Sequence, residues 1–294
     1  MQISANGVAL EVEDHGSPQG EPLLLVMGLG MQLVAWHEGL VAQWVARGFR
    51  VIRYDNRDVG LSQRFDHLGV PNLALGALRH VARLGVRSPY TIADLAEDAA
   101  GLLDALGIRS AHVCGASMGG MIAQHLATRH SKRVRSLTLM MTTSGARRLP
   151  QPNWRVQMAL LQRPARTDDL DSVVDHYVRL YRLIGSPAWP SPPDALRERV
   201  ALAVRRAYRP AAVARQLAAI IADGDRTELL DGIRLPTQVI HGLADPLVPV
   251  AAGRDLAERI REARADLIDG MGHDLPEPLW PRFVEDVGSA AGRA

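Results

Sequence analysis

The chain has 294 residues, of which 47% are hydrophobic and 22% are charged. These values are ordinary for globular proteins and argue against a disordered or fibrous chain. The 34 Lys and Arg side chains nearly cancel the 32 Asp and Glu side chains, and no long block of like charge occurs. We therefore expect no nucleic-acid partner.

The cysteine content and the apolar runs limit the compartment. Cys114 is the one cysteine, which excludes an internal disulfide bond. Residues 1–14 lack the basic and then apolar segments of a secretion signal, and the longest apolar runs fall far short of the roughly 18 residues of a membrane span. We expect a cytoplasmic protein with no membrane partner, and we expect Cys114 to be a core residue rather than a reactive one.

The first half of the chain alternates strand-like and helical runs. This rhythm predicts a mostly parallel, doubly wound α/β sheet that is entered through an antiparallel hairpin. Strands are predicted at 7–13, 22–27, 49–54, 111–116 and 134–141, with helices near 36–47 and 92–106 and a further helix after residue 117.

An irregular stretch, residues 66–89, interrupts this rhythm and contains a short amphipathic helix near 73–84. Long loops of this kind either cover a pocket or decorate the surface, and the sequence leaves both open.

The pattern changes between residues 143 and 234, where strand-like runs disappear and helical ones dominate. A proline-rich piece separates two of these helical runs. The β/α rhythm then resumes. We predict one α/β core from residues 1–142 and 235–294, with residues 143–234 inserted as a helical cap. The predicted elements are helices at 170–183, 195–208, 211–221, 250–261 and 278–287 and strands at 237–241 and 265–268.

The pentapeptide from Gly115 to Gly119, with Ser117 at its centre, is the most informative motif. It lies between a predicted strand and a predicted helix. Small residues two before and two after the serine allow a sharp turn that presents the serine hydroxyl. The pattern therefore predicts that Ser117 is a nucleophile on a strand-turn-helix elbow.

A serine nucleophile needs a base, and the base needs a carboxylate. His273 follows the last predicted strand in a glycine-flanked loop, at the sheet edge where Ser117 also emerges. Asp245 follows the preceding strand. His241, which ends that strand, is the strongest alternative base. The order Ser117, Asp245, His273 is that of an α/β-hydrolase triad.

Negative charge develops on the carbonyl oxygen during serine attack, so two backbone N–H groups should point at it. The elbow supplies one from Met118. The loop 28–30 follows another predicted strand and should supply the second, from Leu29. The same loop lacks the third glycine of a dinucleotide-binding fingerprint.

With these residues assembled, the chain resembles the α/β-hydrolase superfamily over nearly its whole length, and most closely its aclacinomycin methylesterase group. This resemblance implies a serine esterase with a helical cap, a small-molecule ester substrate, and neither metal nor organic cofactor. The chain departs from the group at Leu29, where a second glycine is expected, and in the longer segment 66–89. The motifs that carry the resemblance are residues 24–28, 52–55, 54–62, 117–120 and 270–273.

We therefore predict hydrolysis of carboxylic esters through an acyl-enzyme on Ser117. A serine at the elbow argues against haloalkane dehalogenases and epoxide hydrolases, which resemble this chain but carry aspartate there. Carbon–carbon bond hydrolases, enol-lactonases and perhydrolases share the triad and remain alternatives. A ligand-binding receptor that retains the triad without turnover is a hypothesis from a different class.

Overall fold

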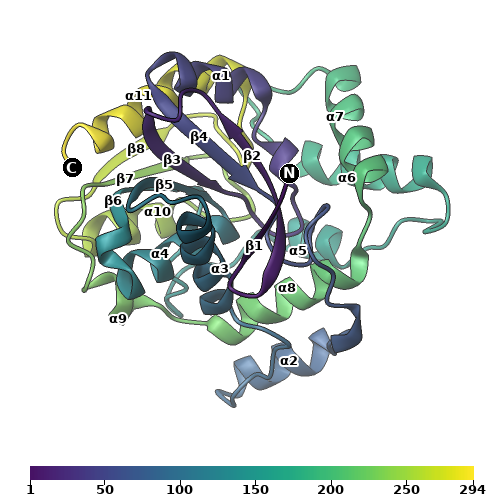
Figure 1. The fold of residues 1–294 in the computed structure, drawn as a ribbon. Coiled ribbons are helices and arrows are strands. Elements are labelled where there is room, and N and C mark those ends of the chain that lie inside the picture. The colour runs from purple at the N-terminus through teal and green to yellow at the C-terminus, as the bar shows by residue number, and fades with distance from the viewer.

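The structure is a computed structural model that describes residues 1–294, apart from the side chain of residue 161. Its centre is an eight-stranded sheet with the order β1-β2-β4-β3-β5-β6-β7-β8 (Figure 1). The strands β1 and β2 form an antiparallel hairpin, β2 pairs antiparallel with β4, and every later pair is parallel. The predicted fold class is thus confirmed. The strands are β1 (Gln2–Ala5), β2 (Val8–His15), β3 (Glu21–Val26), β4 (Phe49–Tyr54), β5 (Ala111–Ala116), β6 (Val134–Met140), β7 (Thr237–Gly242) and β8 (Arg264–Ile268).

Helices cover both faces of the sheet because the central strands are apolar on both sides. In β3, Leu24 and Val26 belong to one core, and Leu23 and Leu25 belong to the other. The first core contains side chains from α3 (Ile92–Ala105), α4 (Met118–Arg129) and α10 (Ala251–Arg259), whereas the second contains side chains from α1 (Glu38–Ala46) and α11 (Trp280–Ala291).

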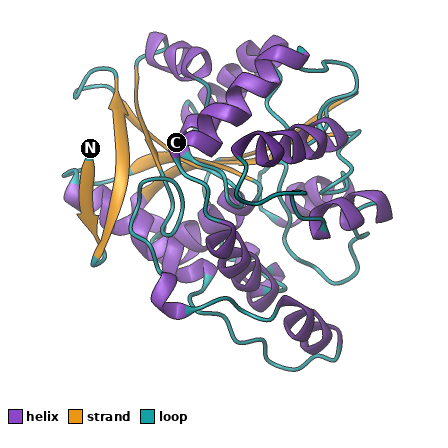
Figure 2. Ribbon diagram, turned by 90° about the vertical axis from the view of Figure 1, so that its right-hand side faces the viewer, coloured by secondary structure: helices purple, strands orange, loops and turns teal.

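Between β6 and β7 the chain forms helices and no strand (Figures 1 and 2). The helices α6 and α7 share a small core of their own, built around Val173 and Val200. Three of these helices agree with the predicted ranges, and the two short ones were not predicted. The proposed division into core and cap stays a prediction. The helices are α5 (Trp154–Leu161), α6 (Leu170–Ile184), α7 (Pro193–Arg206), α8 (Pro210–Asp223) and α9 (Thr227–Leu230).

The segment 66–89 forms the helix α2 (Leu73–Val81), which projects from the body beside α8 (Figure 1). Its N-terminus is capped by Asn72, whose side chain accepts a hydrogen bond from Leu75 N. Among the described residues, no helix combines the length and the apolar character needed to cross a bilayer. The remaining turns include four 3-10 helices at Leu33–Ala35, Asp66–Leu68, Ser131–Arg133 and Glu277–Leu279.

The parallel strands bring distant loops to one edge of the sheet. The strands β3, β5, β7 and β8 run parallel to one another, so their carboxyl ends meet at the same edge. The chain segments that leave those ends carry Leu29, Ser117, Asp245 and His273. Ligand sites in open α/β sheets form at this edge.

Candidate active site

Ser117 lies between β5 and α4 in a conformation that side chains rarely adopt, with φ 55° and ψ −121°. Hydrogen bonds to its backbone N–H and C=O groups hold it there. Ser117 N donates to Met140 O over 2.9 Å, and the Thr142 hydroxyl donates to Ser117 O over 2.7 Å. Strained residues of this kind cluster at functional sites, so the conformation of Ser117 favours a functional role for it.

The glycines around Ser117 are required by close backbone contacts. A Cβ at Gly119 would lie 2.0 Å from Val26 O, and a Cβ at Gly115 would lie 2.3 Å from Gly119 O. Both distances are impossible for real atoms, so neither position accepts a side chain without movement of the backbone. The turn is therefore tight enough to expose the serine at the end of β5.

The structure brings the three predicted side chains together. Ser117 Oγ lies 3.1 Å from His273 Nε2, and His273 Nδ1 lies 2.7 Å from Asp245 Oδ2. An ionised carboxylate only accepts hydrogen bonds, so the proton on the imidazole belongs on Nδ1. His273 Nε2 is then free to accept the serine proton, as a general base requires.

Two backbone donors fix the carboxylate of Asp245. Its Oδ1 accepts hydrogen bonds from Leu247 N over 2.9 Å and from Val248 N over 2.8 Å, which leaves Oδ2 for His273. The side chain of Asp245 is 0% exposed. The carboxylate thus has one oxygen committed to its own loop and one to the imidazole.

The alternative base, His241, is placed behind the carboxylate. Its Nε2 donates to Val248 O over 2.8 Å and lies 3.6 Å from Asp245 Oδ2. Burial lowers the pKa of His241, and the imidazole is therefore neutral near pH 7. It is His273 that contacts Ser117, while His241 supports the loop that carries Asp245.

The two N–H groups expected to bind the oxyanion come from segments beside Ser117. Met118 is the first residue of α4, so its N–H is one of the helix's unpaired N-terminal donors. The loop with Leu29 passes directly over the nucleophile, because a Cβ at Gly28 would lie 3.1 Å from Ser117 Cβ. Both segments therefore adjoin Ser117, and the assignment of their N–H groups to the oxyanion stays a prediction.

The end of α6 holds the loop that carries His273, a contact that sequence reasoning missed. His273 N donates to Ile184 O over 2.7 Å, and Gly272 N donates to the Ser186 hydroxyl oxygen over 2.9 Å. The Ser186 hydroxyl in turn donates to Asp274 Oδ1. No local sequence signal identifies these residues, because the contact joins segments that are far apart in the chain. Ser186 and Asp274, for example, are separated by 88 positions.

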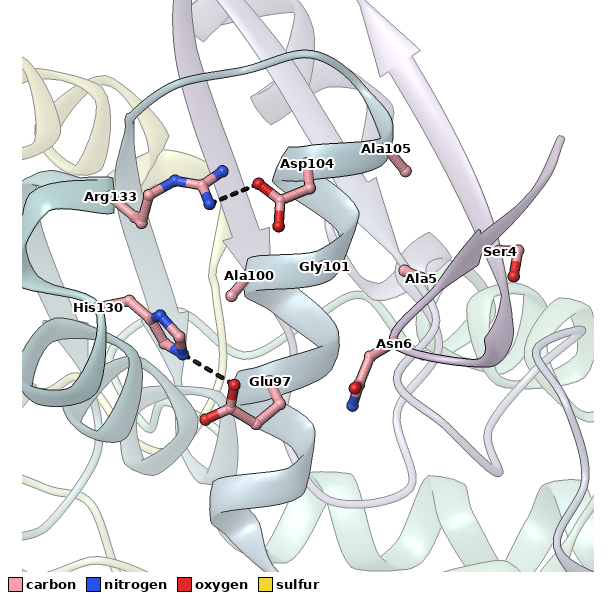
Figure 3. Close-up of a pocket in the computed structure, with 10 residues that line it drawn as sticks. All are labelled: Ser4, Ala5, Asn6, Glu97, Ala100, Gly101, Asp104, Ala105, His130 and Arg133. Carbon is pink, nitrogen blue, oxygen red and sulfur yellow. Dashed lines mark hydrogen bonds and ion pairs between the residues drawn. The ribbon is translucent and has the colours of Figure 1, made fainter.

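A cavity of about 550 Å³ lies away from this site (Figure 3). It adjoins His130, which follows the C-terminal end of α4, whereas Ser117 precedes the N-terminal end. Because a helix of 12 residues is about 18 Å long, the length of α4 separates the cavity from Ser117. Its charged side chains pair with one another, His130 with Glu97 and Arg133 with Asp104, as the dashed lines in Figure 3 show. Each of these four side chains at the cavity wall therefore has a partner of its own. The other side chains at its wall include Ser4, Asn6, Ala100 and Gly101.

Comparison with known proteins agrees with this geometry. A family model described as the alpha/beta hydrolase fold matches residues 21–277. The rhodomycin D methylesterase DnrP of Streptomyces peucetius is 32% identical over 305 residues, covering 94% of this chain and 94% of that protein. The predicted resemblance to a methylesterase group is thereby confirmed.

Solved structures show the same fold. The enol-lactonase from Burkholderia xenovorans LB400 is 28% identical with a TM-score of 0.72 and covers 99% of this chain and 100% of its own. A meta-cleavage product hydrolase from Pseudomonas fluorescens IP01 is 20% identical with a TM-score of 0.77. The match covers 100% of this chain and 97% of that hydrolase. On the family match and on the methylesterase identity, this chain belongs to the alpha/beta hydrolase family.

Proposed function

We propose that this protein hydrolyses carboxylic esters through an acyl-enzyme on Ser117. The observation that carries the proposal is the continuous hydrogen-bonded chain from the Ser117 hydroxyl through His273 to Asp245. The family and the names of the methylesterase relatives support a carboxylic ester hydrolase. The core and cap boundaries predicted from the sequence are part of this proposal.

In the first half of the reaction, Ser117 Oγ attacks the ester carbonyl carbon while His273 Nε2 takes the hydroxyl proton. The N–H groups of Leu29 and Met118 stabilise the oxyanion, and Asp245 stabilises the imidazolium. The imidazolium then gives its proton to the leaving alcohol, which departs and leaves the acyl group on Ser117.

In the second half, His273 takes a proton from water as the water attacks the acyl-enzyme. Collapse of the second oxyanion intermediate breaks the bond to Ser117 Oγ, and His273 returns the proton to the serine. The products are the free acid and the alcohol. Every proton in this cycle moves through one imidazole, and no step involves a metal or an organic cofactor.

The test compares Ser117→Ala with Ser131→Ala, a matched loss of an exposed serine hydroxyl in a 3-10 helix. We expect Ser117→Ala to lose at least about 10⁴-fold in kcat on p-nitrophenyl butyrate, because serine knockouts in such triads lose that much or more. Ser131→Ala should match the wild type. Near wild-type turnover by Ser117→Ala would refute the proposal.

A substrate panel separates the alternatives that share the triad. Simple esters, five-membered enol-lactones and vinylogous diketones are compared by kcat/KM under the same conditions. We expect esters to have the highest value. A higher value for lactones or diketones would move the assignment to a lactonase or a carbon–carbon bond hydrolase, and fluorophosphonate labelling without any turnover would favour a receptor.

A further inference from the structure

A glutamine on an inserted helix contacts the loop that carries Leu29. Gln216 lies on α8 and is 0% exposed. Its Oε1 accepts a hydrogen bond from Gly30 N over 2.8 Å, across a separation of 186 residues. Its Nε2 donates to Arg57 O over 3.3 Å. The amide thus presents an acceptor to the loop and a donor to a core carbonyl, and these two partners fix its orientation.

The loop itself is a β-turn. Met31 N donates to Gly28 O over 3.2 Å, Leu29 keeps a negative φ, and Gly30 has a φ of +65°. These signs define a type II turn. A type I turn differs from it by a rotation of about 180° of the central peptide, here the one between Leu29 and Gly30. The direction of the Gly30 N–H therefore distinguishes the two forms.

We infer that Gln216 is a positioning residue that holds the Leu29–Gly30 peptide in the form in which the Leu29 N–H faces the oxyanion. This inference rests on the proposed function. The side chain of Gln216 accepts the N–H that a rotation of the peptide would turn away. A rotated peptide would displace the Leu29 backbone, and catalytic groups misplaced by about 1 Å lose most of their effect.

The helix α8, which carries Gln216, is itself fixed to the turn after β4. Arg215 donates two hydrogen bonds to Asp58, over 2.5 Å and 2.9 Å, and both side chains are buried. The Val213 side chain adjoins the loop so closely that a Cβ at Gly30 would lie 2.8 Å from Val213 Cγ2. These contacts therefore fix the position of Gln216 relative to the turn at Leu29 and Gly30.

A second glutamine joins the same loop to α7. Gln32 Nε2 donates to Ala203 O over 2.6 Å and to Ala207 O over 3.0 Å. The loop with Leu29 is thus bounded by two inserted helices, α7 and α8. On this inference, both helices help to hold the loop that supplies the Leu29 N–H.

The experiment uses Gln216→Leu, which removes both hydrogen-bonding atoms with little change in size. We expect kcat to fall roughly 10- to 100-fold while KM changes less than about threefold, because the lost interaction acts in the transition state. An alkyl trifluoromethyl ketone, which forms an oxyanion on the serine, should lose affinity by the same factor as kcat/KM. A residue that only supported the fold would not produce this parallel.

Gln216→Glu provides a second readout. Its ionised carboxylate keeps an acceptor for Gly30 N but places negative charge near the oxyanion and loses the donor to Arg57 O. Protonation restores a neutral group with one donor and one acceptor. We therefore expect the ratio of Gln216→Glu to wild-type kcat/KM to rise as the pH is lowered, beyond the profile set by the wild-type enzyme.

The control is Gln238→Leu, which removes another buried glutamine amide, on β7, where Gln238 Nε2 donates to Asp286 Oδ1 over 3.0 Å. It should lower the melting temperature and leave kcat unchanged. Wild-type kcat and inhibitor affinity in Gln216→Leu, with Ser117→Ala inactive, would overturn the inference alone. An active Ser117→Ala would instead overturn the proposed function. Equal kcat losses in both leucine variants would also overturn the inference.

Discussion

At the scale of single residues, the site depends on two glycines that leave different amounts of room for a side chain. Gly119 and Gly28 both adjoin the nucleophile, but their surroundings differ. A Cβ at Gly119 would meet the backbone oxygen of Val26 at 2.0 Å, whereas a Cβ at Gly28 would meet Ser117 Cβ at 3.1 Å. The first contact requires the sheet to move, and the second requires a shift of only a few tenths of an ångström.

We predict different outcomes for alanine at these two glycines. Gly119→Ala should lose both stability, by about 3 kcal/mol or more, and activity, because β3 and the elbow must separate. Gly28→Ala should lose less than about 1 kcal/mol of stability and roughly tenfold in kcat, because only Ser117 and, slightly, the neighbouring Ala116 carbonyl must move. Urea unfolding and ester kinetics on both variants measure this. Equal stability losses would contradict the assignment of the contacts.

Asp245→Asn tests the tautomer of His273. The N–H groups of Leu247 and Val248 need an acceptor, so the amide oxygen of the asparagine should face them and its NH₂ group should face His273. His273 Nδ1 would then accept, and its proton would move to Nε2, where it blocks proton transfer from Ser117. We expect kcat to fall by about 10⁴ with little change in melting temperature. A fall of less than tenfold would exclude a role for the tautomer.

At the scale of elements, the contact of α11 with the sheet contains a carboxyl group in an unfavourable place. Gln238 donates to Asp286 Oδ1, while Asp286 Oδ2 is buried without a hydrogen-bond partner among the described atoms. Burial and the neighbouring Asp266 raise the pKa of Asp286 to about 7. The folded protein therefore binds this proton more tightly than the unfolded chain does.

This raised pKa predicts a pH-dependent stability. The stabilisation from protonated Asp286 is fully present below about pH 4, the ordinary aspartate value, and is lost as the pH rises through about 7. Asp286→Asn keeps the acceptor and offers a donor to Asp266. We expect it to raise the free energy of unfolding at pH 8 by about 1 to 2 kcal/mol, after allowance for solvent screening, and by little at pH 4.

Urea unfolding at both pH values checks this prediction. Asp231→Asn, at an exposed turn, provides the matched control and should change stability equally little at either pH. A gain for Asp286→Asn that is the same at pH 4 and pH 8 would show that the carboxyl does not titrate as described.

The long elements were predictable because their periodicity extends over several turns. Residues 92–106 and 170–183 were expected to be helical, and α3 and α6 occupy Ile92–Ala105 and Leu170–Ile184. The strand β1 and the helix α9 each have four residues, too few to show a period. They form because tertiary contacts, such as pairing of β1 with β2, stabilise them.

The candidate site divides in the same way. Ser117, Asp245 and His273 each follow a strand at one sheet edge, so chain order and local motifs sufficed to select them. Gln216 and Ser186 could not be selected, because their importance arises from contacts between an inserted segment and loops far away in sequence. A glutamine within a helix resembles any other helical glutamine until its partner is known.

At the scale of the whole molecule, a buried ion pair joins α8 to the turn after β4. Arg215 on α8 and Asp58 in the turn after β4 are 1% and 0% exposed. Arg215→Met would leave Asp58 buried without its cation. We expect a loss of about 3 to 5 kcal/mol in the free energy of unfolding, measured in urea.

A cycle of Asp58→Asn, Arg215→Met and the double variant isolates the pairing energy. Asparagine tolerates the positive φ of 73° at this position, so the backbone should be retained. The double variant should recover a substantial part of the stability lost by Arg215→Met. If the two single losses simply add, the carboxylate and the guanidinium do not interact in the folded protein.

Because Cys114 lies in the middle of the sheet, its thiol can serve as a probe of sheet opening. Its thiol is fully buried in β5, the strand that leads to the nucleophile, 3.6 Å from the sulfur of Met140, and burial raises its pKa. A disulfide reagent such as DTNB can reach this sulfur only when the middle of the sheet comes apart. The rate at which DTNB modifies Cys114 therefore reports how often the sheet opens in the unmodified protein. An ester analogue bound over Ser117 should lower this rate.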